Sequence, residues 1–200
     1  MGNAPKMTTD IASTTADVII LTGPPGAGKS TTAHDLAMQF ERSVHLHTDD
    51  FWHYIANGAI PAYLTESDGQ NQVVMDVIRG AAFTYAAGGY TTIIDGIVGP
   101  WMLHHFSDLH DDEPTPQLHY VVLRPDRDET LFRAQARTTP DALVDREPVL
   151  SMWDQFASLH DLETHVIDTS TQNPAETLAA VWQAISSGKY ILPEAQRAPH

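Results

Sequence analysis

The chain has 200 residues, 42% of them hydrophobic, and a formal net charge of −15. This length suits one compact domain, whereas the acidic balance argues against a nucleic-acid-binding surface, which needs clustered Lys and Arg. The absence of cysteine excludes disulfides and thiolate metal sites. No apolar run is long enough to span a bilayer, so we expect a cytoplasmic protein with no membrane partner, either a monomer or a homodimer.

The first recognisable motif lies between an expected strand and an expected helix. Residues 1–16 are expected to form a disordered leader. Residues 17–22 form a β-branched apolar run and residues 30–40 have helical apolar spacing. Between them, the sequence GPPGAGKS from Gly23 to Ser30 fits the phosphate-binding loop pattern G-x-x-x-x-G-K-[ST]. Its glycines let successive backbone N–H groups surround a phosphate at a helix N-terminus.

This loop predicts a nucleoside triphosphate site, with ATP and Mg²⁺ as cofactors. We expect Lys29 to lie in a solvent-facing position and to reach the β- and γ-phosphates, and Ser30 to bind Mg²⁺. The predicted nucleotide-binding residues of this segment are Gly23, Pro24, Pro25, Gly26, Ala27, Gly28, Lys29, Ser30 and Thr31.

The second expected strand, residues 43–48, ends at two acidic residues. Ligands of parallel sheets lie at the carboxyl ends of the strands, so an acid here would face the γ-phosphate. Asp49 is the candidate that accepts the proton of an acceptor hydroxyl or orients a Mg²⁺-bound water. Asp50 either caps a helix that starts near Phe51 or replaces Asp49 as the catalytic acid.

A long helix at residues 70–87 leads to a third expected strand at residues 90–95. This strand ends Ile93-Ile94-Asp95-Gly96, a Walker-B type of Mg²⁺ site, so Asp95 joins Ser30 as a predicted metal ligand. Gly96 occupies the position where ATP-hydrolysing motor proteins usually carry a glutamate base. The sequence therefore does not favour a motor ATPase.

The acceptor pocket is expected between the second strand and the long helix. Aromatic side chains there would stack on a ring or a sugar, and an arginine would bind a carboxylate or phosphate of the acceptor. Core packing of the aromatics and a helix-surface position of the arginine are the alternatives. The predicted substrate-binding residues are Asp49, Phe51, Tyr54, Arg79, Gly96 and Trp101.

Arginines gather after the fourth expected strand, residues 117–124. Arg133 and Arg137 are four residues apart on an expected helix at 126–137, so both are predicted to converge on the moving phosphoryl group as catalytic residues together with Lys29 and Asp49. A solvated helix face is the alternative. The polar residues 138–147 suit a mobile lid, and Arg146 is a further predicted nucleotide-binding residue.

A strand at residues 163–169 and a helix at 174–187 complete the pattern, and residues 188–200 are expected to form a tail. Asp126 with Glu129, at the start of the helix at 126–137, and Asn173 with Glu176 both match helix-capping boxes. The alternation of strands and helices predicts an α/β fold with three layers (α/β/α), of the P-loop NTPase type. It contains a five-stranded parallel sheet and a small arginine-bearing lid, within one domain at residues 17–187.

Two other site types receive little support. The histidines His45 and His47 share a strand face, but no H-x-x-x-H pair or cysteine accompanies them, so we assign them to ordinary half-exposed positions rather than to a metal site. A guanine-nucleotide switch would carry an Asn-Lys-x-Asp motif, which the sequence lacks.

The order of these motifs resembles the P-loop kinases built on the nucleoside monophosphate kinase pattern, among them chloramphenicol phosphotransferase, zeta toxins, and the gluconate and shikimate kinases. The segment from Thr48 to Phe51 also resembles the Asp-x-Phe element of uridine kinases. The resemblance covers roughly residues 17–187. It implies that Asp49 is the substrate-activating acid, that Arg133 and Arg137 are lid arginines, and that the loop after Asp168 contacts adenine.

The resemblance implies an ATP-dependent phosphotransferase that acts on a hydroxyl of a small molecule. No nucleobase-monophosphate or shikimate-recognition motif is present, so a metabolite, a sugar, a nucleoside and an antibiotic all stay open as acceptors. The alternative is a nucleotide-binding switch or regulatory P-loop ATPase without an acceptor. Such a switch needs no acceptor-hydroxyl base, so Asp49 and the arginine pair favour the kinase.

Overall fold

A computed structural model of the chain describes residues 15–107, 116–138 and 143–193. Within these ranges, five parallel strands form one sheet in the order β2-β3-β1-β4-β5. The strands are β1 (Val18–Thr22), β2 (Ser43–His47), β3 (Thr91–Gly96), β4 (Leu118–Leu123) and β5 (Val166–Ile167). The expected five-stranded parallel sheet is confirmed.

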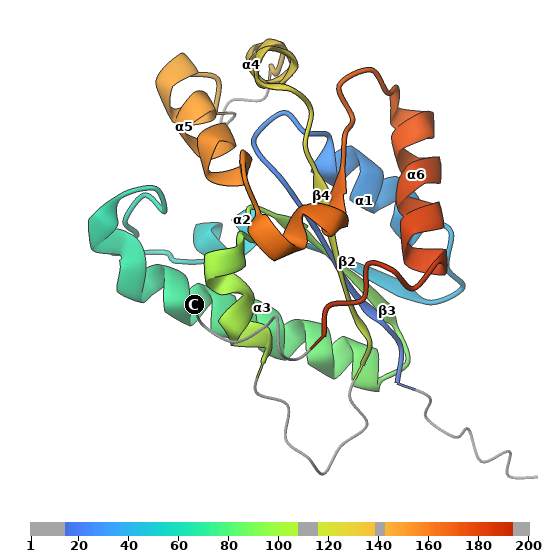
Figure 1. Cartoon of the computed structure of the whole chain (residues 1–200). Helices are drawn as coiled ribbons and strands as arrows, with labels where there is room; N and C mark the ends of the chain where they lie inside the picture. The colour runs from blue at the N-terminus through green and yellow to red at the C-terminus, as the bar shows by residue number, and fades with distance from the viewer. Residues whose placement is uncertain (1–14, 108–115, 139–142, 194–200) are drawn as a thin grey trace, which may run out of the picture.

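Helices cover both faces of this sheet, as Figure 1 shows. The α-helices are α1 (Lys29–Ala37), α2 (Thr48–His53), α3 (Asp68–Ala87), α4 (Arg127–Gln135), α5 (Arg146–Phe156) and α6 (Pro174–Ser186). Three short 3₁₀ helices are η1 (Thr65–Ser67), η2 (Pro100–Phe106) and η3 (His160–His165). The helices α1 and α6 lie on one face and α3 on the other, which gives the predicted three layers.

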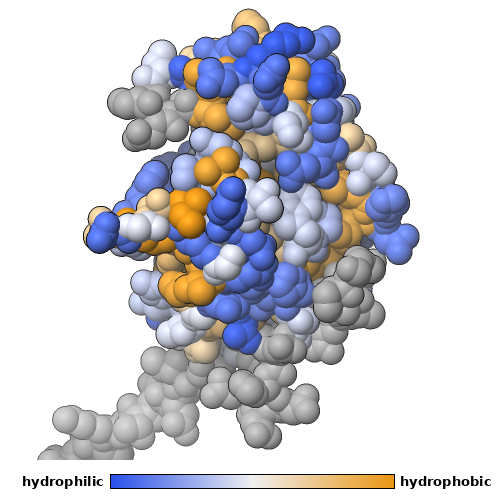
Figure 2. All heavy atoms as spheres, turned by 90° about the vertical axis from the view of Figure 1, so that its left-hand side faces the viewer, coloured by the Kyte–Doolittle hydropathy of each residue, from blue (hydrophilic) through white to orange (hydrophobic). Residues whose placement is uncertain are grey.

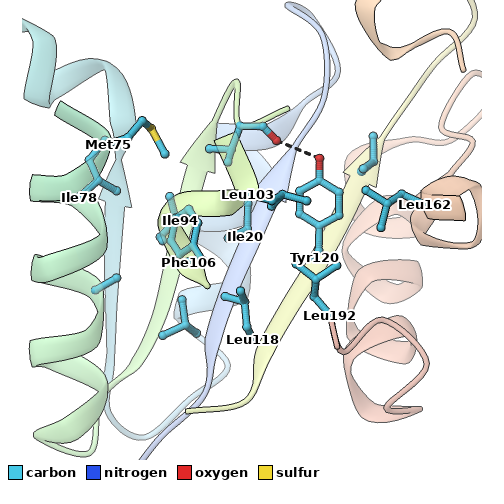
Figure 3. Packing of buried hydrophobic residues seen from close by; sticks show 14 of the residues in the cluster. Ile20, Met75, Ile78, Ile94, Leu103, Phe106, Leu118, Tyr120, Leu162 and Leu192 are labelled. Atoms are coloured by element: carbon cyan, nitrogen blue, oxygen red, sulfur yellow. Dashed lines mark hydrogen bonds between the residues drawn. The ribbon is translucent and has the colours of Figure 1, made fainter. Parts of the chain in front are cut away.

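The core forms on both faces because strand side chains alternate in direction. Ile20 of β1 packs with Met75 and Ile78 of α3, whereas Ile19 packs on the side of α1 and α6. Figure 3 shows the first of these two clusters. In it, the buried hydroxyl of Tyr120 donates a hydrogen bond of 2.9 Å to the carbonyl of Val98, which fixes the segment that follows β3.

Several elements differ from the sequence-based expectation. The strand β5 has only two residues because residues 160–165 form η3, which is held by a double hydrogen bond from Arg124 to Glu163. The helix α4 ends at Gln135, so Arg137 follows the helix instead of lying within it. The helix α5 was not predicted; its buried Val149 and Leu150 pack against α4 in a separate small cluster.

The capping expectations hold in part. Asn173 and Glu176 form the complete capping box of α6. At α4, Asp126 accepts from the backbone N–H of Glu129, but the carboxylate of Glu129 pairs with Arg133 instead of returning to the cap.

The predicted leader and tail, and the central part of the predicted lid, lie largely outside the described residues. In the part that the structure describes, every helix is too short or too polar to cross a membrane.

Candidate active site

The glycine loop joins β1 to α1 and lies directly against α4. Gly26 and Gly28 have φ angles of 81° and 89°, a left-handed conformation that favours glycine. A methyl group at Gly26 would lie 2.7 Å from the carbonyl oxygen of Thr130 in α4. Glycine is therefore required here both for the backbone conformation and for the close approach of α4, which carries Arg133.

Lys29, the first residue of α1, is buried rather than solvent-facing, which corrects the expectation from the sequence. Its Nζ donates a hydrogen bond of 2.9 Å to the carbonyl of Pro24 within the loop. Burial, with a smaller contribution from the charge of Arg137, lowers the pKa of Lys29 to about 8 against the opposing charges of Asp95 and Asp49. The ammonium group is thus held at the loop without a full set of partners.

Asp95, at the end of β3, lies fully buried beside the loop. Its Oδ2 accepts a hydrogen bond of 2.6 Å from the hydroxyl of Ser30. This places two oxygen ligands of the kind that Mg²⁺ prefers next to each other at the start of α1. The fold therefore brings together the two predicted Mg²⁺ ligands, Ser30 and Asp95, from distant parts of the sequence.

Two histidines of β2 also bind Asp95, which the sequence analysis missed. His45 Nε2 and His47 Nδ1 lie 2.5 Å and 3.0 Å from Asp95 Oδ1. Burial alone would raise the pKa of Asp95, but hydrogen bonds from His45, His47 and Ser30 hold it well below its usual range. The hydrogen bond to Asp95 in turn raises the pKa of His47. No group of three or more metal-ligating side chains occurs among the described residues.

Asp49 and Asp50 both lie in the first turn of α2, and both are exposed. This helix begins at Thr48, directly after β2, and its N-cap is His47. The proposed role of Asp50 as a helix cap is therefore wrong. Asp49 Oδ2 lies 3.7 Å from His47 Nε2, and its charge acts on Lys29. The acid predicted at the second strand end therefore acts on Lys29 of the phosphate loop through its charge, without lining the phosphate cavity.

Arg133 and Arg137 line a cavity of about 120 Å³ with loop residues Gly26, Gly28, Lys29, Ser30 and Thr31. The guanidinium of Arg133 donates to Glu129 and to the carbonyls of Thr169 and Ser170, at 2.6, 3.0 and 3.3 Å. Arg133 thus connects α4 to the loop after β5 through hydrogen bonds. The guanidinium of Arg137 has no hydrogen bond or ion pair with any residue in the described ranges, and it is exposed.

The predicted acceptor residues do not all gather in one place. Phe51 and Tyr54 line an open groove between α2 and α3, with a volume of about 370 Å³. Gly96 lies against Thr48, whose Oγ1 would be 1.8 Å from a methyl group at that position. Trp101 packs on Phe156 of α5, with ring centroids 5.9 Å apart.

Two predicted cationic residues lie apart from these sites. Arg79 packs over the ring of Phe83 and does not line the groove. It follows Val73 of the groove by six residues, or about 240° around the helix, so it faces another direction. Arg146 is the exposed first residue of α5 and does not line the phosphate cavity.

Comparisons with known proteins show the family of this chain and the fold that it shares with solved structures. A family model described as AAA domain (AAA_18) matches residues 19–174, well over half of the chain. A comparison with curated proteins found no match.

Solved structures share the fold. A sugar kinase from Janibacter sp. HTCC2649 is 20% identical with a TM-score of 0.62, covering 86% of this chain and 95% of that chain. A shikimate kinase from Acinetobacter baumannii, in complex with shikimate, is 18% identical with a TM-score of 0.62 and coverages of 88% and 96%. A tunicamycin resistance protein from Deinococcus radiodurans is 20% identical with a TM-score of 0.59 and coverages of 89% and 99%.

At these identities the likeness shows the fold, which is that of the P-loop kinases and confirms the resemblance expected from the motifs. The family match covers the glycine loop, Asp49, Asp95 and both arginines of the phosphate cavity. The chain therefore belongs to the AAA domain family that this model describes.

Proposed function

We propose that this protein is an ATP-dependent phosphotransferase that moves the γ-phosphate of ATP to a hydroxyl of a small molecule. The observation that carries the proposal is one small cavity lined by the glycine loop, Lys29 and Arg137, with Asp49 close enough for its charge to act on Lys29. A phosphate cradle with an acid at the end of a nearby strand of the same sheet is the arrangement that phosphoryl transfer to an alcohol needs.

In this proposal the loop and Lys29 hold the β- and γ-phosphates. The loop offers backbone N–H groups at the N-terminus of α1, where the helix dipole favours an anion. Ser30 and Asp95 would hold Mg²⁺, since one or two protein oxygens are what a phosphate-bound Mg²⁺ requires. When bound, the metal neutralises charge on the phosphate oxygens.

Transfer then requires the acceptor oxygen to bond to the γ-phosphorus as the bond from that phosphorus to the β,γ-bridging oxygen breaks. ADP leaves, and the hydroxyl proton passes to Asp49. Arg137, which has no ionic partner within the described ranges, is free to follow the charge on the moving phosphoryl group. An interaction of this kind is worth about a hundredfold to a thousandfold in rate.

The two cavity arginines have different proposed roles. Arg133 already donates to Glu129 and to three backbone carbonyls after β5, so we assign it to the support of the loop expected to contact adenine. It also lines the phosphate cavity. Arg146 does not line the phosphate cavity, so its contact with the nucleotide stays a prediction from the sequence.

The cytoplasmic location stays part of the proposal.

A coupled assay of ADP release tests the function. The panel contains nucleosides, sugars, polyols, and aminoglycoside and phenicol antibiotics, each with Mg²⁺-ATP. The proposal expects ADP release that depends on one class of acceptor and is lost in Asp49→Asn. ADP release that is equal with and without every acceptor would indicate an ATPase or switch, and would contradict the kinase.

A further inference from the structure

The groove between α2 and α3 is lined mainly by apolar side chains. It is lined by Phe51, Tyr54 and Ile55 on one side, and by Gln70, Val73, Val74 and Val77 of α3 on the other. Val73 and Val77 are one helical turn apart and remain 63% and 55% exposed, and Tyr54 is 73% exposed. Exposed apolar side chains gathered in this way mark a binding surface. Figure 2 looks onto this side of the molecule and shows hydrophobic side chains among polar ones.

The one amide that lines the groove is already in use. Gln70 accepts a hydrogen bond of 2.8 Å from the backbone N–H of Ile60 and donates one of 2.7 Å to the carbonyl of the same residue. The groove therefore offers a ligand little beyond apolar surface and the phenol of Tyr54. These two hydrogen bonds also fix the segment before α3, so the groove is formed in the absence of a ligand.

The charges around the groove are negative. No lysine or arginine lines it among the described residues, and Arg79 faces another direction on α3. Exposed Asp50 lies one turn before Tyr54 in α2, and exposed Asp68 begins α3. A carboxylate or phosphate placed here would be repelled by the acidic neighbours. It would also lose hydration without gaining a cationic partner from the lining. A buried ammonium group would likewise find no carboxylate in the lining.

The proposed catalytic acid lies on the helix that forms one wall of the groove. Asp49 precedes Tyr54 by five residues, about 8 Å along the helix axis and about 140° around it, so it does not itself line the groove. An acceptor held between α2 and α3 would therefore present its hydroxyl to Asp49 by extending from the groove around the first turn of α2. A volume of about 370 Å³ is within the range of small-molecule sites.

From this geometry we propose that the acceptor is an uncharged alcohol whose ring or chain occupies the groove between α2 and α3. The assignment rests on the proposed phosphotransferase function. It excludes acceptors whose recognition depends on a carboxylate or phosphate, and it excludes small polyols without an apolar part.

A matched set of probes tests this. The set consists of 3-phenylpropane-1,2-diol, its carboxylate counterpart 3-phenyllactate, its amine counterpart phenylalaninol, and glycerol, which lacks the ring. Binding to the full chain is measured by saturation-transfer NMR with a non-hydrolysable ATP analogue and Mg²⁺, and ADP release is measured separately with ATP. We expect the diol to bind at least about tenfold more tightly than each of the other three.

Variants at Val73 give the sharper test, because this exposed side chain can change without disturbing the core. Val73→Asp should weaken diol binding by about tenfold or more, whereas Met38→Asp, an equal charge change on an exposed residue after α1, should not. Val73→Lys should admit 3-phenyllactate. Circular dichroism confirms that each variant is folded.

Three outcomes would overturn the assignment. These are binding of 3-phenyllactate, phenylalaninol or glycerol as tight as that of the diol, diol binding unchanged in Val73→Asp, and a sedimentation change in Val73→Asp that reveals the groove as a contact between copies. Binding of the diol without any ADP release separates the two claims, since it supports the groove and contradicts the phosphotransferase.

Discussion

The two halves of the candidate site differ in how they are built. At the phosphate end, Lys29 and Asp95 are buried charges. Lys29 donates a hydrogen bond to a loop carbonyl, and Asp95 forms hydrogen bonds with Ser30 and two histidines. At the acceptor end, the groove is apolar, open, and without an ionic group in its described lining. In the proposed function, the first half binds a group of fixed charge and shape. The second half would select its ligand by hydrophobicity and shape, which many compounds share.

The largest expected effect lies at the junction of the two halves. Asp49→Asn should lower phosphoryl transfer by about a hundredfold to ten-thousandfold while ATP affinity stays nearly unchanged, because the residue faces the acceptor. Asp50→Asn is the matched control, one residue later in the same turn, and should cost less than about tenfold. Turnover with calorimetric ATP binding measures both. A large loss of turnover in Asp50→Asn with little loss in Asp49→Asn would contradict this expectation and assign the catalytic role to Asp50.

A somewhat smaller effect separates the two arginines of the phosphate end. Arg137→Ala should lower kcat by about a hundredfold or more, because this cation, which has no ionic partner among the described residues, is proposed to act on the transferring group. Arg133→Ala should mainly raise the KM for ATP, since it releases the loop at Thr169. Arg127→Ala, which removes an exposed pair with Asp154, serves as the control. Equal losses in all three variants would argue against distinct roles.

The buried charge of Lys29 predicts a dependence on pH. Its pKa is lowered by burial from 10.5 to about 8, so between these values the unfolded chain binds more protons than the folded one. Stability of the nucleotide-free protein should therefore rise with pH across this window. Lys29→Met lacks the buried charge and should be more stable at pH 7, by roughly 1 to 3 kcal/mol.

Thermal unfolding of both proteins at pH 7 and pH 10 measures this difference, which should shrink at the higher pH. ATP affinity of the wild type should fall above pH 8, by up to about tenfold per pH unit, as the ammonium is lost. A lower melting temperature for Lys29→Met at pH 7 would contradict the assignment of burial as the cause.

The smallest effect concerns the acceptor half alone. Gln70→Leu removes both hydrogen bonds to Ile60 and should loosen the segment before α3, at a cost of about 1 kcal/mol per bond. We expect the KM for the acceptor to rise several-fold while that for ATP is unchanged. Gln72→Leu, which instead loses a contact with His104, is the matched control. A rise in the KM for ATP would show that the halves are not independent.

The phosphate end was largely predictable from the sequence because its chemistry depends on local motifs. The glycine loop, Ser30 and Asp95 each follow a strand whose apolar run is easily recognised, and parallel strands place their ends together. The same reasoning placed Asp49 at the end of β2. The likeness to solved kinases confirms the fold but leaves the role of each residue as a proposal.

Other features depend on tertiary contacts that no local pattern shows. His47 reaches Asp95 because the register of β2 and β3 sets the two residues opposite each other, and an H-x-H alternation beside an Asp-ending strand is the only sequence signal for it. The burial of Lys29 depends on the fold of the glycine loop, whose Pro24 carbonyl accepts a hydrogen bond from its Nζ, and the direction of Arg79 depends on which face of α3 packs. The apolar groove likewise appears only when α2 and α3 are placed together.

The central claim is that the γ-phosphate of ATP is transferred to an alcohol and not to water. Phosphorus-31 NMR of a reaction with the acceptor that gives the most ADP release tests it directly. The account predicts a phosphomonoester formed in a one-to-one ratio with ADP by the wild type, and almost none by Asp49→Asn. Inorganic phosphate as the only product that accompanies ADP would contradict it.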